Sequence, residues 1–144
     1  MSFNYKKILL IFSVLLATAV TGNASGNKGS RKGFDWNPIM EAIIQVESEG
    51  NANAVSGKYC GAMQISPILV EECNNILKSR NSKKRYTLKD RFSVEKSKEM
   101  FLLIQSHFNP SNDVEKAIRS WNGGNNYKVR STNGYYRKVI SAMR

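Results

Sequence analysis

The chain has 144 residues, of which 41% are hydrophobic and 23% are charged, and its formal net charge is +11. This length gives room for one domain and excludes two, and the composition is that of a globular protein that can bury a core. The excess of basic residues predicts a polyanionic partner: nucleic acid, anionic lipid or an acidic polymer of a cell envelope.

Residues 1–24 are predicted to be a signal peptide. Lys6 and Lys7 precede an uncharged run from Ile8 to Val20, and small residues of the cleavage-site type follow that run. The run is shorter than the roughly 20 residues of a spanning helix, although an uncleaved anchor is the alternative. We therefore expect an exported protein, periplasmic or associated with the envelope, that meets the membrane only through this segment.

Residues 25–34 have the composition of a flexible basic linker, and residues 35–144 form the predicted domain. Cleavage after residue 24 removes two lysines and no acid, which changes the formal charge from +11 to +9. Because the protein is expected to be exported, nucleic acid is the least favoured of the polyanionic partners, and the acidic polymers of the envelope are favoured.

Cys60 and Cys73 are the only cysteines in the chain. In an oxidising compartment the pair is a candidate disulfide, and two small buried thiols are the equal alternative. Neither cysteine lies in a metal-binding pattern, and the single histidine, His107, has no ligand partners nearby. The sequence therefore predicts no metal and no cofactor.

Apolar residues at helical spacing predict four or five helices, an all-α domain with at most one very short β-hairpin between Lys58 and Ile65. The expected helix starts are Asn37-Pro38, Ser66-Pro67, Ser93, Asn112 and a position near Gly134. The helix after Ser93 has the most regular apolar spacing and is expected to be the hydrophobic spine, with His107 in a structural role.

The stretch from Lys78 to Arg91 carries seven basic residues against the single acid Asp90. It is expected to be a long exposed loop. A solvated run of charge is the favoured interpretation, and a docking surface for an anionic polymer is the functional alternative.

Glu47 is the informative departure from the apolar pattern of the first helix. It shares a stripe with Met40, Ile43 and Ile44, and it lies in the last turn of the helix. Burial and the negative end of the helix dipole both raise the pKa of such a carboxyl, which suits a general acid that must be protonated near neutral pH. A surface glutamate is the commoner role for any one such residue.

Three motifs in order resemble the lytic transglycosylases with a soluble-transglycosylase domain, which has the goose-type lysozyme fold. The first runs from Glu47-Ser48 through the Asn-rich loop to Gly61-Ala62-Met63-Gln64-Ile65 and Pro67. The second is Ala117-Ile118-Arg119-Ser120-Trp121-Asn122-Gly123-Gly124, with Trp121 where the family usually has tyrosine. The third matches the family in the spacing of Thr132, Tyr135 and Val139. The resemblance covers roughly residues 36–143.

The resemblance implies an enzyme that cleaves the β-1,4 bond between N-acetylmuramic acid and N-acetylglucosamine without water and leaves a 1,6-anhydro end. Glu47 would be its single acid and base. The residues implied to support Glu47 or to bind the saccharide are Ser48, Met63, Gln64, Trp121, Asn122 and Tyr135.

Two other functions are kept as alternatives. A hydrolytic muramidase on the same fold would need a second carboxylate to hold water, for which Glu49 and Asp90 are the candidates. The other alternative is a non-catalytic peptidoglycan-binding module of an envelope-spanning secretion or conjugation machine. Such a machine is also considered as a partner of an active enzyme. The expected partner is peptidoglycan glycan, bound by a monomer.

Overall fold

The computed structural model describes residues 33–144, so the predicted signal peptide and most of the predicted linker lie outside the described residues. The elements in chain order are α1 (Asn37–Ser48), β1 (Val55–Ser56), β2 (Tyr59–Cys60), α2 (Pro67–Ser79), the 3-10 helix η1 (Leu88–Phe92), α3 (Val94–Phe108), α4 (Val114–Gly123) and α5 (Val129–Ala142). The predicted all-α class with one very short hairpin is therefore confirmed. No helix within residues 33–144 combines the length and the apolar character that crossing a membrane requires.

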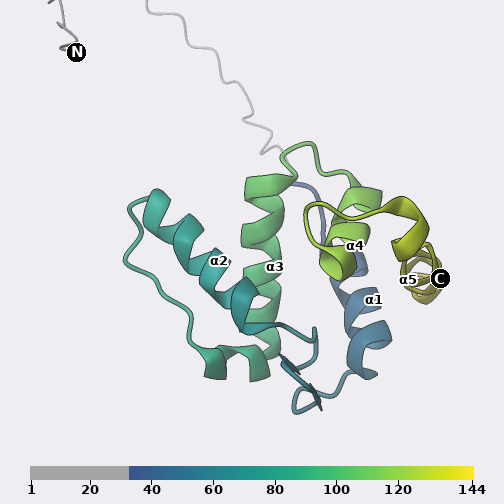
Figure 1. The fold of residues 1–144 in the computed structure, drawn as a ribbon, viewed down its shortest axis with the longest axis horizontal. Helices are drawn as coiled ribbons and strands as arrows, with labels where there is room; N and C mark the ends of the chain where they lie inside the picture. The colour runs from purple at the N-terminus through teal and green to yellow at the C-terminus, as the bar shows by residue number, and fades with distance from the viewer. Residues whose placement is uncertain (1–32) are drawn as a thin grey trace, which may run out of the picture. The chain divides into compact units, whose positions relative to one another are not determined.

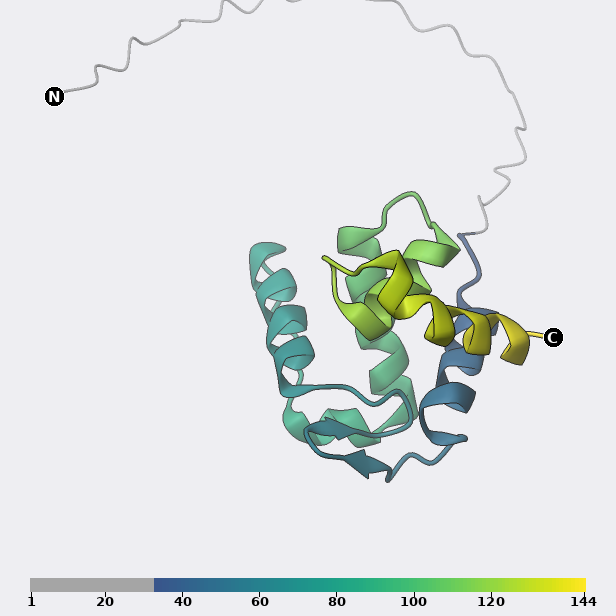
Figure 2. The same cartoon turned by 45° about the vertical axis from the view of Figure 1, so that its right-hand side comes forward.

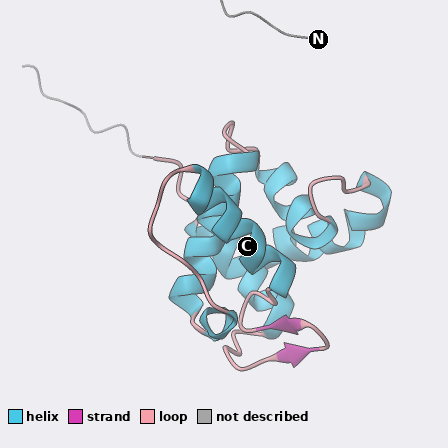
Figure 3. Cartoon of the chain, turned by 60° about the vertical axis from the view of Figure 1, so that its left-hand side comes forward, coloured by secondary structure: helices cyan, strands magenta, loops and turns pink. Residues whose placement is uncertain are grey.

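Helix α3 lies in the middle of the domain (Figure 1), with α2 on one side of it and α1, α4 and α5 on the other. The turned view in Figure 2 keeps the same order. The antiparallel strands β1 and β2 pair Val55 with Cys60 and lie together at one end of the helices (Figure 3). The hairpin lies near the lower ends of α3 and α1, and α2 lies across α3 from α4 and α5 (Figure 1).

The core forms where α1 meets α3 and α4. Ile43, Phe101 and Ile118 are fully buried there, one from each helix. Burial of an Ile or Phe side chain of this kind contributes about 1.5–3 kcal/mol to the free energy of folding. Phe101 also contacts the rings of Trp36 and Trp121, at centroid distances of 5.6 and 5.2 Å. The predicted spine is therefore the centre of the core.

Two helix starts agree with the sequence to the residue. The hydroxyl oxygens of Ser66 and Ser93 accept hydrogen bonds from the backbone N–H groups of the first turns of α2 and α3. At α4 the predicted cap was wrong by one residue, because Asn112 has a positive φ of 56° and the neighbouring Asp113 caps the helix.

The start of α5 was also predicted wrongly. The helix begins at Val129, five residues before Gly134, and its N-cap Lys128 makes no side-chain cap. In α1, the N-cap is Trp36 rather than Asn37, whose backbone N–H and side-chain amide both donate to Asp35.

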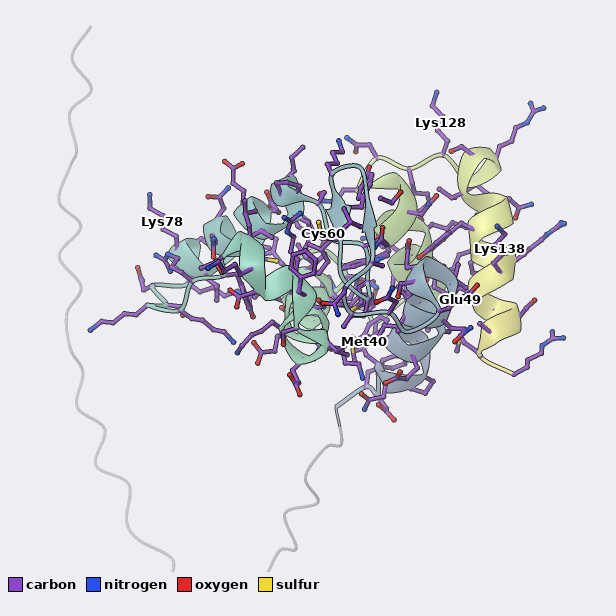
Figure 4. All side chains as sticks on the ribbon, turned by 90° about the horizontal axis from the view of Figure 1, so that it is seen from below. Met40, Glu49, Cys60, Lys78, Lys128 and Lys138 are labelled. Carbon is purple, nitrogen blue, oxygen red and sulfur yellow. The ribbon has the colours of Figure 1, made fainter. Side chains whose placement is uncertain are left out.

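The stretch from Lys78 to Arg91 is only partly the predicted exposed loop. Lys78 belongs to the end of α2 and points away from the domain (Figure 4). Arg91 is buried in η1, where its guanidinium donates to the backbone carbonyls of Leu88, Lys58 and Ile65. Arg91 therefore joins η1 to the segment that follows β1 and cannot belong to an outer docking surface.

Cys60 and Cys73 are both buried and free in the structure. Cys60 ends β2, whereas Cys73 lies inside α2 with its thiol 3.8 Å from the carbonyl oxygen of Met100 in α3. Of the two alternatives for this pair, the structure contains the two thiols and not the disulfide.

Candidate active site

Helix α1 delivers Glu47 from the interior of the domain to its surface. The buried residues of this helix end at Ile44, and Glu47 follows one turn later, half-buried. The helix stops at Ser48, since Glu49 adopts the left-handed conformation at φ 54° and Gly50 follows at φ 84°. The carboxyl is therefore fixed at the end of a helix whose other side is locked into the core.

Tyr135 from α5 contacts this carboxyl directly. Its hydroxyl donates a hydrogen bond to Oε1 of Glu47 at 2.7 Å. The two residues lie 88 positions apart in the sequence, so their contact depends on the packing of α5 against α1. The bond leaves Oε2 of Glu47 without a protein partner among residues 33–144.

Burial raises the cost of ionising both groups, whereas their hydrogen bond acts in opposite directions on the two. Burial raises the pKa of Glu47 above its ordinary value of 4.5, and the hydrogen bond from Tyr135 partly offsets that rise. Burial also raises the pKa of Tyr135, and the charge of Glu47 raises it further. Tyr135 therefore stays a neutral donor, while Glu47 can hold a proton at a higher pH than a free glutamate.

Glu47 opens into a cleft of about 360 Å³. Its lining residues are Glu47, Ser56, Tyr59, Gln64, Ser66, Leu69, Trp121 and Asn122. The hairpin and the start of α2 supply one wall, and the end of α4 supplies the other. Glu47 is the only carboxylic acid among the lining residues.

The segment between β2 and α2 is folded tightly under this cleft. Ser48 donates to the carbonyl of Ala62 at 2.8 Å, which joins the end of α1 to the segment. Gly61 has a positive φ of 80°, and a Cβ at this position would lie 1.7 Å from the carbonyl oxygen of Arg91. Only glycine fits at this position. Gln64, which lines the cleft, donates a hydrogen bond from its side chain to the Gly61 carbonyl at 2.9 Å.

The side chain of Met63 does not line the cleft, contrary to the prediction. It is fully buried, because Gln64 takes a left-handed conformation at φ 50° and Ile65 bridges back to Cys60, which turns Met63 inward. Met63 instead offers its carbonyl oxygen to the indole N–H of Trp121 at 3.3 Å. The donor in this hydrogen bond is the indole N–H of Trp121, a group that the tyrosine expected at this position lacks.

The predicted residues thus divide into two groups. Glu47, Gln64, Trp121 and Asn122 line one cleft, and Tyr135 is bonded to Glu47. Ser48 and Met63 do not line it, but each bonds the segment before α2 to a helix, Ser48 as the donor to Ala62 and Met63 as the acceptor from Trp121. Sequence reasoning missed Ser56, Tyr59, Ser66 and Leu69 as lining residues. An aromatic residue beside the Asn-rich loop, Tyr59, was the one available signal.

A buried arginine fixes α5 against α4. Arg119 donates to Glu115 at 2.7 Å, and to the Val129 carbonyl and the Thr132 hydroxyl at 3.1 Å each. Its guanidinium also lies over the ring of Tyr136, 4.4 Å from the centroid. These contacts secure the first turns of the helix that carries Tyr135.

The two acids considered for a hydrolytic mechanism do not face the cleft. Glu49 is exposed at the C-cap of α1, and Asp90 accepts hydrogen bonds from Thr87 at the start of η1. Within residues 33–144 no three residues of His, Cys, Asp and Glu are grouped so that they could hold a metal ion.

Comparison with known proteins agrees with this arrangement. A scan against protein-family models matches the Transglycosylase SLT domain over residues 24–143. Searches of curated proteins and of solved structures gave no significant match. The family match covers most of the chain, including Glu47, Gln64, Trp121 and Tyr135, and members of this family act on peptidoglycan outside the cytoplasm. The chain therefore belongs to the Transglycosylase SLT domain family of glycan-cleaving proteins.

Proposed function

We propose that the protein is a peptidoglycan lytic transglycosylase, which cleaves the β-1,4 bond between N-acetylmuramic acid and N-acetylglucosamine without water and leaves a 1,6-anhydro-muramoyl end. Glu47 is its single catalytic acid and base. The observation that carries the proposal is a lone, half-buried carboxyl with a raised pKa, held by Tyr135 at the base of an open cleft.

In the first step, protonated Glu47 donates its proton to the bridging oxygen, and the bond from this oxygen to the muramoyl C1 breaks. Glu47 is then a carboxylate that Tyr135 stabilises through its hydrogen bond. In the second step, the carboxylate takes the proton of the C6 hydroxyl of the same muramoyl residue, whose oxygen attacks C1. Glu47 is protonated again, and no water has been consumed.

The make-up of the cleft favours this reaction over hydrolysis. An inverting hydrolase needs a second carboxylate, about 6.5–9.5 Å from the first, to activate water, and a retaining hydrolase needs one at about 5–5.5 Å. Glu47 is the only acid that lines the cleft. Gln64 and Asn122 supply amide groups, and Trp121 and Tyr59 supply aromatic rings of the kind on which sugars stack.

Mass spectrometry of the soluble products from purified sacculi tests the proposal. The wild-type protein should release anhydro-muropeptides, and Glu47→Gln should lower their yield about 10²–10⁴-fold, the range for a lost general acid. Glu49→Gln is the matched control, because Glu49 is an exposed acid two residues away. Reducing-end products, heavier by one water of about 18 Da, would instead make the protein a muramidase. No products with retained wall binding would make it a binding module.

We also propose that residues 1–24 direct export of the protein. The support is the order of basic, apolar and small residues in the sequence. N-terminal sequencing of the protein recovered from the periplasm should start near residue 25, whereas a chain that still begins at Met1 in the membrane fraction would mark an anchor.

A further inference from the structure

Helix α5 carries a row of exposed basic side chains, which we call the α5 basic face: Arg130, Arg137 and Lys138. Lys128 and Arg144, just before and just after the helix, are also exposed. Residues 116–144 contain no acid, and none of these five cations forms an ion pair within residues 33–144. Their positive charge is therefore not neutralised within the part of the chain that the structure describes.

The spacing of the α5 basic face gives it the form of a row. Arg130 and Arg137 are seven residues apart, just under two helical turns, so they lie on the same side of α5 at about 10.5 Å along its axis. Lys138 lies within the same third of the helix circumference. Gly134 and Ser141, which are small and exposed, lie on this side as well. No bulky side chain therefore interrupts the row.

The α5 basic face points away from the cleft. Thr132 and Val139 are the buried residues of α5, and they lie on the opposite side of the helix from Arg130 and Arg137. Tyr135, which contacts Glu47, lies one turn before Val139 on that inner side. None of the residues of the basic face lines the cleft. The row is thus a surface separate from the site at Glu47.

The chemistry of the α5 basic face fits a polyanion that stays in water. A helix that binds in a membrane interface places a large apolar face in the lipid, whereas the apolar side of α5 is buried in the domain through Val139. Single-stranded nucleic acid stacks its bases on aromatic side chains, and the basic face has none. Two of its three cations are arginines, whose planar guanidinium groups bind phosphate oxygens through paired hydrogen bonds.

Charge complementarity favours a phosphodiester polymer over the wall glycan itself. The peptide substituents of peptidoglycan carry amino groups beside their carboxylates, so their charges partly cancel. A linear phosphodiester polymer carries one uncompensated negative charge in every repeat. Such a polymer can lie along the row and place successive phosphates against successive cations, which raises its attraction to this face of the domain.

We propose that the α5 basic face binds phosphodiester polymers attached to the cell wall. The inference goes beyond the proposed function, because the contact involves neither Glu47 nor the cleavage of a glycan bond. The face holds the domain on polymer-bearing wall while the cleft, on another side of α5, stays open to glycan.

Two preparations of the same walls test the proposal: walls that carry a glycerol phosphate polymer, and walls from which hydrofluoric acid has hydrolysed the phosphodiesters. In a pelleting assay the wild type should bind the first about tenfold more tightly than the second. The triple variant Arg130→Gln, Arg137→Gln, Lys138→Gln should lose this difference, because three modest contacts of exposed charges together amount to about tenfold in affinity.

A second triple variant, Lys78→Gln, Lys83→Gln, Lys89→Gln, is the matched control. It removes the same charge from exposed positions outside α5, and it should keep the tenfold preference. The double variant Arg130→Lys, Arg137→Lys keeps the charge of the row without its guanidinium groups. It should retain part of the preference, which separates phosphate binding from a change in folding.

Three results would overturn the assignment. The first is an equal affinity of the wild type for the two walls, and the second is an undiminished preference in the variant that lacks the basic face. The third is tighter binding to phosphatidylglycerol vesicles or to duplex DNA than to polymer-bearing walls, lost in the same variant, which would assign the face to a membrane or to nucleic acid.

Cleavage of soluble glycan strands without phosphate separates this inference from the proposed function. The variant that lacks the basic face should keep the wild-type kcat/KM on these strands, because the face does not line the cleft. Polymer-dependent binding with no cleavage by the wild type would refute the enzyme and retain the polymer site. Cleavage with equal binding to both walls would do the reverse.

Discussion

The burial of Glu47 favours proton donation but opposes the stability of the folded domain. Its position between the core and the cleft keeps water away and raises its pKa, which favours proton donation. The same burial makes its carboxylate form costly to the folded state. The hydrogen bond from Tyr135 offsets part of this cost. The residue that serves the reaction is therefore expected to reduce the stability of the domain.

Glu47→Gln should accordingly stabilise the protein at neutral pH. In the wild type the folded-state pKa lies above the unfolded value near 4.5, so the free energy of unfolding falls as the pH rises from that value through the folded pKa, and the penalty is complete above both. The carboxamide of glutamine avoids this penalty and can still accept the bond from Tyr135.

Thermal unfolding at pH 7 and at pH 4 measures the effect. We expect Glu47→Gln to have a Tm higher by a few degrees at pH 7 and a much smaller difference at pH 4, where glutamate is mostly protonated in both states. Glu49→Gln should show no such pH-dependent gain. A lower Tm for Glu47→Gln at pH 7 would contradict the stated cause.

At the residue scale, the sequence predicted site residues well where the residue type departs from the local pattern. An acid on an apolar stripe identified Glu47, and the family motifs led to Gln64, Trp121 and Asn122. The inward turn of Met63 was hidden, because it depends on the left-handed backbone of Gln64, a residue type that gives no signal for a positive φ.

Among the elements, α5 depends on a partner outside itself. It has no side-chain cap at its start, and Arg119 of α4 instead binds the Val129 carbonyl and the Thr132 hydroxyl. Tyr135 lies one turn beyond Thr132. The geometry at Glu47 is thus maintained by an arginine that does not touch the cleft.

Arg119→Met should weaken both the fold and the activity. Its loss leaves the Thr132 hydroxyl and the Val129 carbonyl without their charged partner, which should cost about 2 kcal/mol or more in the free energy of unfolding. Urea unfolding measures this cost. Cleavage should fall further than that of Tyr135→Phe under conditions where both variants remain folded.

Arg137→Met is the control for this change, because Arg137 is an exposed arginine of α5, the helix that Arg119 supports. It should leave the urea midpoint almost unchanged. An Arg119→Met variant as stable as the wild type would show that α5 is held by its apolar contacts alone.

Element boundaries were predictable where a side chain marks them. Ser66 and Ser93 are the N-caps of α2 and α3, and α4 ends at Gly123 and Gly124. The start of α5 has no such mark, because the side chain that binds its first turn is Arg119, which lies on another helix. The burial of Arg91 was equally hidden, since its partners are the carbonyls of a segment some 30 residues earlier.

On the scale of the molecule, the positive charge is distributed differently from the sequence-based hypothesis. Within the stretch from Lys78 to Arg91, Lys84 is paired with Glu99, Arg85 donates to neighbouring carbonyls and Arg91 is buried. Residues 116–144 contain seven basic residues and no acid. Lys128, just before α5, and Lys138 within it lie on the opposite side of the domain from Lys78 (Figure 4).

Binding to isolated cell walls should therefore depend on α5 more than on the Lys78–Arg91 stretch. In a pelleting assay, reversal of Arg137 and Lys138 to glutamate should reduce binding several-fold more than the same change at Lys83 and Lys89. Raising the salt from about 0.05 M to about 0.5 M should weaken the wild type, because it shortens the range of exposed charges. Salt-independent pelleting would show that charge does not drive the binding.

The two free, buried thiols of the domain can be used to measure how often the domain opens locally. Burial and the charge of Glu72 raise the pKa of Cys73 to about 12, and Cys60 is also buried. Only an exposed thiolate reacts readily with an alkylating reagent, so the folded chain should gain mass slowly and the urea-unfolded chain quickly. The rate of alkylation of Cys73 in native buffer then reports how often α2 separates from α3, with no mutation required.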